Sequence, residues 1–290
     1  MPESFTTLVT VEQLVDHLDD PTWCVIDVRH DLMDPEAGPR AYVAGHIPGA
    51  VFAHTDYDLS GAKTGRNGRH PLPERADIVR AFRRWGVNDD TQIVAYDAHG
   101  GNFAVRLWWL ARWLGHTRVA VLDGGWPKWI EATGLSSTET PNRPPGSLTE
   151  GSSSMPLVAT DGVLRNLGSR ERLVLDARTP ERYRGEQEPI DPVAGHIPGA
   201  RNRPWQRNLE ADQTFKSPQA LRQEFAAALG STAPARVVHQ CGSGVTACHN
   251  LLAMEIAGLA GSALYAGSWS EWIADPGRPV ATGDEAAAEP

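Results

Sequence analysis

An internal repeat is the feature that most constrains how this chain can fold. The residues Ala-Gly-His-Ile-Pro-Gly-Ala occur at 44–50 and again, unchanged, at 194–200. Other landmarks recur in the same order, such as Asp-Val-Arg at 27–29 and Asp-Ala-Arg at 176–178, and a later pair of tryptophans in each half. This order indicates a duplicated domain, and two copies are too few for a solenoid. Each copy is long enough to fold as one domain.

Within each copy, short apolar runs alternate with amphipathic segments. We predict a first helix after Thr10, whose spacing to Gln13 is that of a capping box. A polar loop should follow the first strand as far as residue 44, and residues 53–73 should be irregular. The remaining predicted elements are strands at 23–28, 92–96, 119–122, 173–176 and 237–238, and helices at 74–85, 103–114, 217–229 and 248–259. This alternation indicates an α/β fold, with two tandem domains that each have a mainly parallel sheet flanked by helices.

The composition between the two copies is that of a linker. Residues 139–156 contain four prolines, two glycines and four serines, with almost no apolar side chains. We therefore predict a first domain over residues 1–138 and a second over residues 157–280. The Ala- and Glu-rich end, residues 281–290, is predicted to be a disordered tail.

The bulk composition excludes several classes of protein. The net charge of −9 argues against nucleic acid as a partner, because phosphate binding needs clustered Lys and Arg. No run approaches the roughly 18 apolar residues of a membrane span, so no membrane partner is predicted, and the start of the chain does not have the pattern of a signal peptide. The three cysteines do not form a disulfide framework and suit a reducing compartment, so we predict a cytoplasmic protein.

The two copies diverge at one loop. It begins with Asp97 in the first copy and with Cys241 in the second, in each case shortly after a predicted strand. In open parallel sheets, ligands bind at the carboxyl ends of the strands. Gly242 and Gly244 allow the backbone N–H groups to turn inward, and the following helix N-terminus adds to a site that favours negative charge. Such a site favours a thiolate, so we predict that Cys241 is a nucleophile; the alternative is a buried structural cysteine.

The loop Cys-Gly-Ser-Gly-Val-Thr-Ala at 241–247 resembles the active-site loop of the rhodanese superfamily. It is more similar to the 3-mercaptopyruvate sulfurtransferases than to the thiosulfate-preferring rhodaneses, whose loop usually carries basic residues after the cysteine. With the repeat, the resemblance extends over nearly the whole chain. It implies a catalytic second domain and a non-catalytic first domain. It also implies ping-pong transfer of a sulfane sulfur from 3-mercaptopyruvate or thiosulfate, through a Cys241 persulfide, to cyanide, a thiol or a thioredoxin-like protein.

The resemblance also indicates residues around the cysteine. Arg182 matches the family's substrate-binding arginine, and His46 and Asp34 resemble first-domain residues proposed to assist proton transfer. His46 is repeated as His196, which favours a role in the scaffold, so the unrepeated His70 is a further candidate. The loop residues predicted to contact the donor, through hydroxyl or backbone N–H groups, are Gly242, Ser243, Gly244, Val245 and Thr246.

One position departs from the family pattern. The mercaptopyruvate enzymes have a second arginine about nine residues after the first, whereas residues 188–191 here read Glu-Pro-Ile-Asp. Arg184 and Arg203 are candidates to replace it, and the choice between 3-mercaptopyruvate and thiosulfate stays open, as do the physiological acceptor and the oligomeric state. Cys248 should face the helix packing. Neither a metal nor a cofactor is predicted, since no second Cys/His pair lies at ligand spacing.

Two other functions use a similar cysteine. A cysteine phosphatase closes its loop with an arginine that binds phosphate, and this loop has none. A non-enzymatic sulfur carrier, which holds a persulfide for one protein partner, shares Cys241 and remains the alternative to an enzyme. It predicts slow turnover of small donors.

Overall fold

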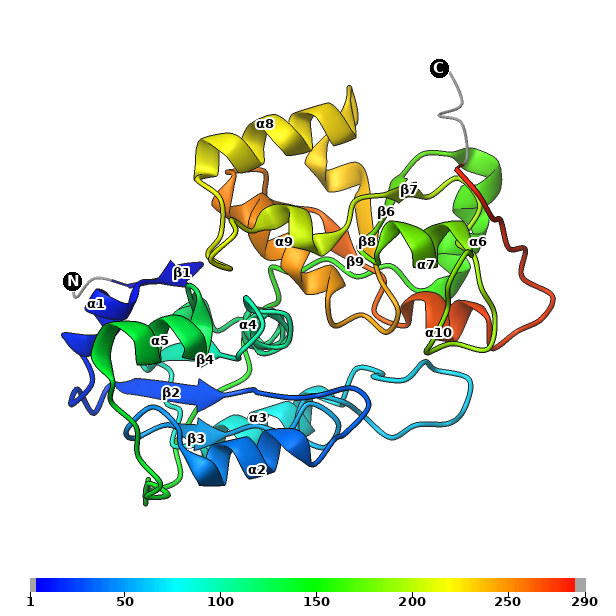
Figure 1. Cartoon of the computed structure of the whole chain (residues 1–290). Helices are drawn as coiled ribbons and strands as arrows, with labels where there is room; N and C mark the ends of the chain where they lie inside the picture. The colour runs from blue at the N-terminus through cyan, green and yellow to red at the C-terminus, as the bar shows by residue number, and fades with distance from the viewer. Residues whose placement is uncertain (1–3, 285–290) are drawn as a thin grey trace. The chain divides into compact units, whose positions relative to one another are not determined.

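A computed structural model describes residues 4–284 of the chain, which divides into two compact units (Figure 1). Of the described residues, the first unit contains 4–61, 73–154 and 210–215, and the second contains 62–72, 155–209 and 216–284. Each unit therefore includes a short segment from the other half of the chain, which the domain boundaries drawn from the sequence do not anticipate. Most of the proposed linker belongs to the first unit, where Gly146 N–H donates to the Arg83 carbonyl at 2.7 Å.

The first unit is built on a five-stranded sheet in the order β1-β5-β4-β2-β3, and every strand pair is parallel. Its elements are β1 (Leu8–Val9), α1 (Val11–Val15), β2 (Trp23–Asp27), α2 (Ala37–Ala44), β3 (Val51–Phe52), α3 (Arg75–Arg84), β4 (Gln92–Tyr96), α4 (Ala104–Trp113), β5 (Val119–Leu122) and α5 (Gly125–Thr133). The predicted polar loop before residue 44 is wrong over α2. There, Tyr42 stacks on His46 with ring centroids 3.9 Å apart, a contact that sequence periodicity does not reveal.

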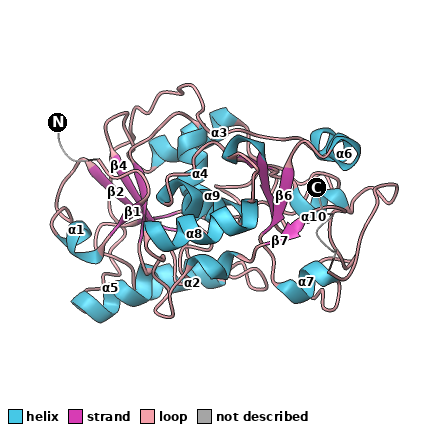
Figure 2. Ribbon diagram, turned by 90° about the horizontal axis from the view of Figure 1, so that it is seen from above, coloured by secondary structure: helices cyan, strands magenta, loops and turns pink. Residues whose placement is uncertain are grey.

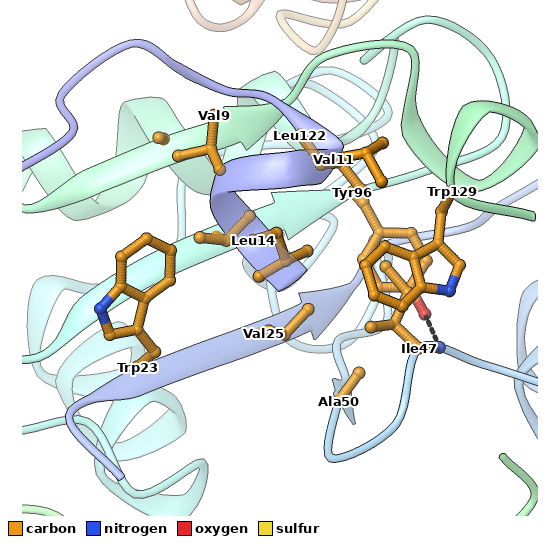
Figure 3. Close-up of a cluster of buried hydrophobic side chains, with 12 residues drawn as sticks. Val9, Val11, Leu14, Trp23, Val25, Ile47, Ala50, Tyr96, Leu122 and Trp129 are labelled. Atoms are coloured by element: carbon orange, nitrogen blue, oxygen red, sulfur yellow. Dashed lines mark hydrogen bonds between the residues drawn. The ribbon is translucent and has the colours of Figure 1, made fainter. Parts of the chain in front are cut away.

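One core layer of the first unit lies between its sheet and the helices α1 and α5. The Thr10–Gln13 capping box is present, and it starts α1 so that Val11 and Leu14 face the strands. Figure 3 shows these side chains packed with strand residues and with Trp129 of α5. Burial of such aliphatic and aromatic groups contributes about 1.5–3 kcal/mol each, so this layer stabilises the sheet far more than the cap does.

The second unit repeats the plan with a four-stranded parallel sheet in the order β7-β6-β8-β9. Its elements are α6 (Thr160–Ser169), β6 (Leu173–Asp176), α7 (Pro180–Arg184), β7 (Arg201–Asn202), η1 (Trp205–Asn208), α8 (Pro218–Leu229), η2 (Pro234–Arg236), β8 (Val237–Gln240), α9 (Ala247–Ile256), β9 (Ala263–Leu264) and α10 (Ser268–Trp272). Helices α6, α7 and α10 cover one face of the sheet, and α8 and α9 lie on the other side (Figures 1 and 2). The predicted α/β fold with parallel sheets flanked by helices is confirmed in both units.

The same buried ion pair recurs at the end of β2 in the first unit and of β6 in the second. Asp27 binds Arg29 at 2.6 Å, and Asp176 binds Arg178 at 2.7 Å. Each arginine also donates to the carbonyl of a repeated glycine, Gly45 or Gly195. Each also lies beside a repeated tryptophan ring, Trp126 or Trp269. A buried charge needs such partners, so the repeated residues hold the scaffold together in both copies.

The C-terminal end is ordered further than expected. Ala281 pairs with His196 through two backbone hydrogen bonds of 2.8 and 3.0 Å, and Gly283 N–H donates to the Arg184 carbonyl. The predicted disordered tail is therefore wrong over 281–283, because these residues satisfy backbone groups of the second unit. Residues 285–290 lie outside the described part. None of the helices within residues 4–284 has the length and apolarity needed to cross a membrane.

Candidate active site

Cys241 stands at the carboxyl end of β8, where the chain turns through a loop into α9. Gly244 adopts a φ of +78°, and its N–H points back at Cys241 Sγ at 3.1 Å. From α10, the Trp269 and Ser270 N–H groups donate to the carbonyls of Cys241 and Gly242 at 3.0 and 2.9 Å. Helix α10 thus holds the first two residues of the loop, and the sulfur is nearly enclosed, with Cys241 only 1% exposed.

The cysteine loop presents backbone donors to an incoming anion. Within residues 4–284, no protein atom accepts a hydrogen bond from the N–H groups of Ser243, Val245 or Thr246. They lie at the start of α9, where the helix dipole adds a partial positive charge. Such a set of unsatisfied N–H groups is a concave anion site.

In the corresponding loop of the first unit, the backbone N–H groups bind a carboxylate. Asp97 is fully buried, and its carboxylate accepts four backbone N–H groups, those of His99, Gly101, Phe103 and Ala104, at 2.7–3.0 Å. In the first unit, a side-chain anion therefore occupies the loop. In the second, a cysteine stands in its place and the loop donors are open to a ligand.

His70 reaches the loop from the segment 62–72. Its Nδ1 lies 2.7 Å from the hydroxyl oxygen of Ser243, and the side chain is 3% exposed. Of the three candidates for proton transfer that the sequence suggested, His70 is the one the structure brings to the loop within the second unit. A histidine bonded to a serine hydroxyl can pass a proton between the two.

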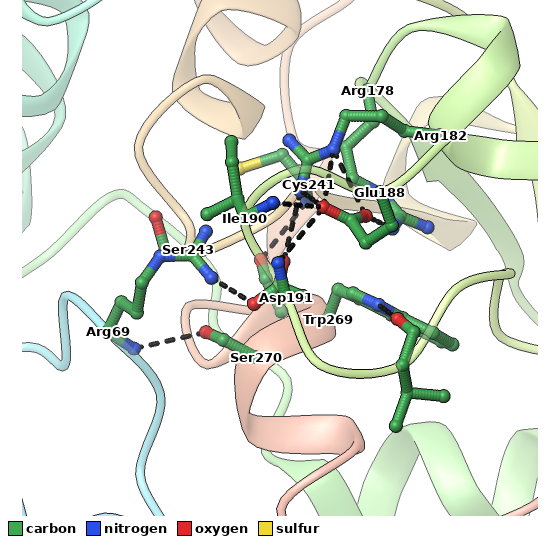
Figure 4. Close-up of polar contacts among 12 residues, drawn as sticks. Arg69, Arg178, Arg182, Glu188, Ile190, Asp191, Cys241, Ser243, Trp269 and Ser270 are labelled. Atoms are coloured by element: carbon green, nitrogen blue, oxygen red, sulfur yellow. Dashed lines mark hydrogen bonds and ion pairs between the residues drawn. The ribbon is translucent and has the colours of Figure 1, made fainter. Parts of the chain in front are cut away.

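Arg182 extends from α7 toward the loop and is held by carboxylates (Figure 4). Glu188 accepts from its Nε and Nη2 at 3.0 and 2.7 Å, and Asp191 accepts from Nη2 at 3.0 Å. Burial raises the pKa of Asp191, and the neighbouring Arg69 opposes that rise. A Cβ placed on Gly242 would lie 3.5 Å from Nη2 of Arg182, so the guanidinium stands over the residue beside the cysteine.

Arg69 is a residue of this site that sequence reasoning missed. Its Nη1 forms an ion pair with Asp191, and its backbone N–H donates to the Ser270 hydroxyl at 3.0 Å (Figure 4). A Cβ on Gly242 would lie 2.9 Å from its Nη2. The one available signal was its position next to His70, since Arg69 is 122 residues from Asp191 along the chain.

The other candidates from the sequence have contacts of their own. In the first unit, the ring nitrogens of His46 lie 2.8 and 3.1 Å from the carbonyls of Tyr42 and Glu139, and Asp34 pairs with the exposed Arg40. In the second unit, Arg184 pairs with Glu186 and lies at the surface, and Arg203 is buried against Asn208, Glu224 and the Phe225 ring. Cys248 is buried, with its sulfur 3.4 Å from the Gly244 carbonyl.

Two parallel α/β units in tandem, one of which carries a cysteine within an anion-binding loop, define the class of protein. The model of the Rhodanese-like domain matches residues 10–132 and again residues 160–275. The chain belongs to the rhodanese-like family and is a two-domain sulfurtransferase.

Similar proteins carry related names. A probable 3-mercaptopyruvate sulfurtransferase of Pseudomonas aeruginosa is 47% identical over 285 residues, which cover 97% of this chain and all of that relative. The thiosulfate sulfurtransferase of Bos taurus is 35% identical over 81% of this chain and 79% of its own. The crystal structure of SseA from Escherichia coli, described among 3-mercaptopyruvate sulfotransferases, matches with a TM-score of 0.79 and 30% identity over 91% of this chain and 99% of that chain.

Proposed function

We propose that the protein moves a sulfane sulfur from 3-mercaptopyruvate or thiosulfate, through a persulfide on Cys241, to a thiophilic acceptor. The observation that carries the proposal is the loop itself. Gly244 N–H contacts the cysteine sulfur, and neighbouring N–H groups are open at the position where the first unit binds a carboxylate. Donors of this kind stabilise a thiolate and the charge that develops on sulfur during transfer.

The first half-reaction is a displacement at the donor's outer sulfur. The Cys241 thiolate attacks that sulfur, a new S–S bond forms, and the bond between the sulfur and the rest of the donor breaks. Thiosulfate then leaves as sulfite. 3-Mercaptopyruvate leaves as the enolate of pyruvate, which takes up one proton. The His70–Ser243 pair, at 2.7 Å, is placed to deliver that proton.

The second half-reaction returns the thiolate. Cyanide, a small thiol or a reduced thioredoxin-like protein attacks the outer sulfur of the persulfide, and the S–S bond breaks with the electron pair returning to Cys241. The residues require neither a metal nor an organic cofactor for these steps. A reducing compartment such as the cytoplasm fits the three free cysteines, Cys24, Cys241 and Cys248.

Steady-state transfer to cyanide tests the proposal, with 3-mercaptopyruvate and thiosulfate measured side by side. Cys241→Ser is expected to abolish transfer from both donors, because serine is a far weaker nucleophile toward sulfur. In the wild type, incubation with donor alone should add the mass of one sulfur atom to the peptide that contains Cys241.

The control is Cys24→Ala in the first unit. Burial raises the pKa of Cys24 to about 11, so its thiol stays protonated, and this variant should retain transfer. Full turnover by Cys241→Ser would refute the proposal. A stable persulfide with almost no turnover of either donor would favour the sulfur-carrier alternative.

A further inference from the structure

We propose that Arg69, a residue of the first repeat, is the second donor-binding cation of the cysteine site and takes the place of the arginine that is absent at position 191. This inference rests on the proposed function and names the group that receives the charged end of the donor. Asp191 acts as a positioning residue, because it holds Arg69 and Arg182 side by side.

The two guanidinium groups converge on the cysteine loop. The Cβ position of Gly242 is 2.9 Å from Arg69 Nη2 and 3.6 Å from Arg182 Nη1. Within the described part of the chain, neither of these nitrogens donates to a protein acceptor. Both face the residue next to Cys241, so an anion bound to them would have its sulfur close to the thiolate.

Among the three arginines near the loop, Arg69 is the most accessible to a bound anion. Arg178 is 1% exposed and Arg182 is 15% exposed, and both are bonded to Glu188, whereas Arg69 is 25% exposed. The Nε of Arg69 is buried and has no hydrogen-bond partner. A partly exposed guanidinium with unused donors gains from an anion that arrives with several oxygens.

Asp191 explains how an acid can stand where a basic residue was expected. Its two carboxylate oxygens accept from different arginines, Oδ1 from Arg69 and Oδ2 from Arg182. One carboxylate thus fits between the two groups and fixes their spacing. Arg69 Nη2 and Arg182 Nη1, which Asp191 does not bind, both lie close to Gly242, and there the carboxylate of 3-mercaptopyruvate or the sulfonate oxygens of thiosulfate can bind.

Steady-state kinetics on Arg69→Gln test the proposal. We expect KM for an anionic donor to rise about tenfold or more with little change in kcat, because a charge-assisted contact to the bound donor is lost. The KM of Arg69→Lys should lie between the wild-type value and that of Arg69→Gln, because lysine keeps the positive charge but lacks the planar guanidinium group. Comparison of the two donors shows which one the pair binds: the donor with the larger rise in KM has its charged end at Arg69.

The matched control is Arg66→Gln. Arg66 lies in the same segment and is exposed, so this variant removes the same charge away from the loop. Its KM values should stay at the wild-type level.

A second readout does not depend on turnover. The rate of alkylation of Cys241 by iodoacetate, divided by the rate with neutral iodoacetamide, reports the positive charge beside the sulfur. This ratio should fall on the order of threefold or more in Arg69→Gln and stay unchanged in Arg66→Gln. If the wild type transfers no sulfur, the function proposed above fails while the ratio still tests Arg69. Equal ratios and equal KM values in both variants would overturn the inference, and Arg69→Lys carries the test if Arg69→Gln does not fold.

Discussion

At Gly244, the backbone of the cysteine loop leaves no room for a side chain. The residue has a φ of +78°, and a Cβ there would overlap the carbonyl group of Ala266. This tight contact brings the Gly244 N–H to within 3.1 Å of the Cys241 sulfur. The glycine is therefore required by the position of one hydrogen-bond donor as well as by backbone conformation.

Gly244→Ala is predicted to lower sulfur transfer by more than about tenfold, because the loop must move to relieve the overlap and the N–H then leaves the sulfur. The control is Gly199→Ala, also in the second unit, with a φ of +79° and no atom within 4 Å of the added Cβ. That variant should lose about 1–2 kcal/mol of stability from backbone strain and keep its turnover. Equal activities in the two variants would contradict the importance of the Gly244 contact.

A strand–loop–helix element occurs at the corresponding place in both units, and its loop begins with a different residue in each. In the β4–α4 loop, Asp97 neutralises the inward N–H groups with its own carboxylate. In the β8–α9 loop, Cys241 leaves them to a ligand. The duplicated element is thus a self-satisfied structural loop in the first unit and an open anion site in the second.

Asp97→Asn is predicted to destabilise the first unit by at least about 2 kcal/mol, since an amide group loses the charge and turns its NH₂ toward backbone donors. Urea unfolding and the hydrogen exchange of the Phe103 and Ala104 amides would measure the loss. Asp31→Asn is the control, because Asp31 is exposed and accepts a single bond from the Met33 N–H. A surface change of this kind should stay within about 0.5 kcal/mol. Identical unfolding of both variants would contradict the prediction.

The pH dependence of stability is a property of the whole molecule to which His239 contributes. His239 is fully buried in β8, and burial, with a smaller effect of the Arg203 charge, lowers its pKa to about 3. Below about pH 6.5, the unfolded chain binds a proton at this histidine that the folded protein does not bind. The folded state therefore loses stability at His239 as the pH falls from about 6.5 toward 3.

His239→Gln is predicted to make the decline in unfolding free energy shallower between about pH 6 and pH 4. The slope should differ from the wild type by up to about 1.4 kcal/mol per pH unit, the effect of one proton. His99→Gln, at an exposed position, should leave the slope unchanged. The slope separates this effect from any constant loss of stability that the substitution causes. A variant with the wild-type slope would show that His239 is protonated in the folded state.

Local patterns account for the part of the fold that was predictable. The capping box at Thr10, the strand at 92–96 and the helix that begins after Ser217 are each determined by residues a few positions apart, and the structure confirms them. Strands of two residues, such as β3 and β9, are too short to show periodicity. Helix α2 was missed because its stability comes from packing that involves residues beyond it.

The sequence by itself determined the duplicated α/β plan and the loop where the two copies diverge, because both are visible in the linear order of residues. Only the tertiary structure decided which cations and which histidine accompany Cys241 in the second unit. Arg69 and His70 belong to the first repeat, yet they contact Asp191 and Ser243, 122 and 173 residues away. These contacts form because residues 62–72 belong to the second unit. The local spacing of residue types does not show to which unit such a segment belongs.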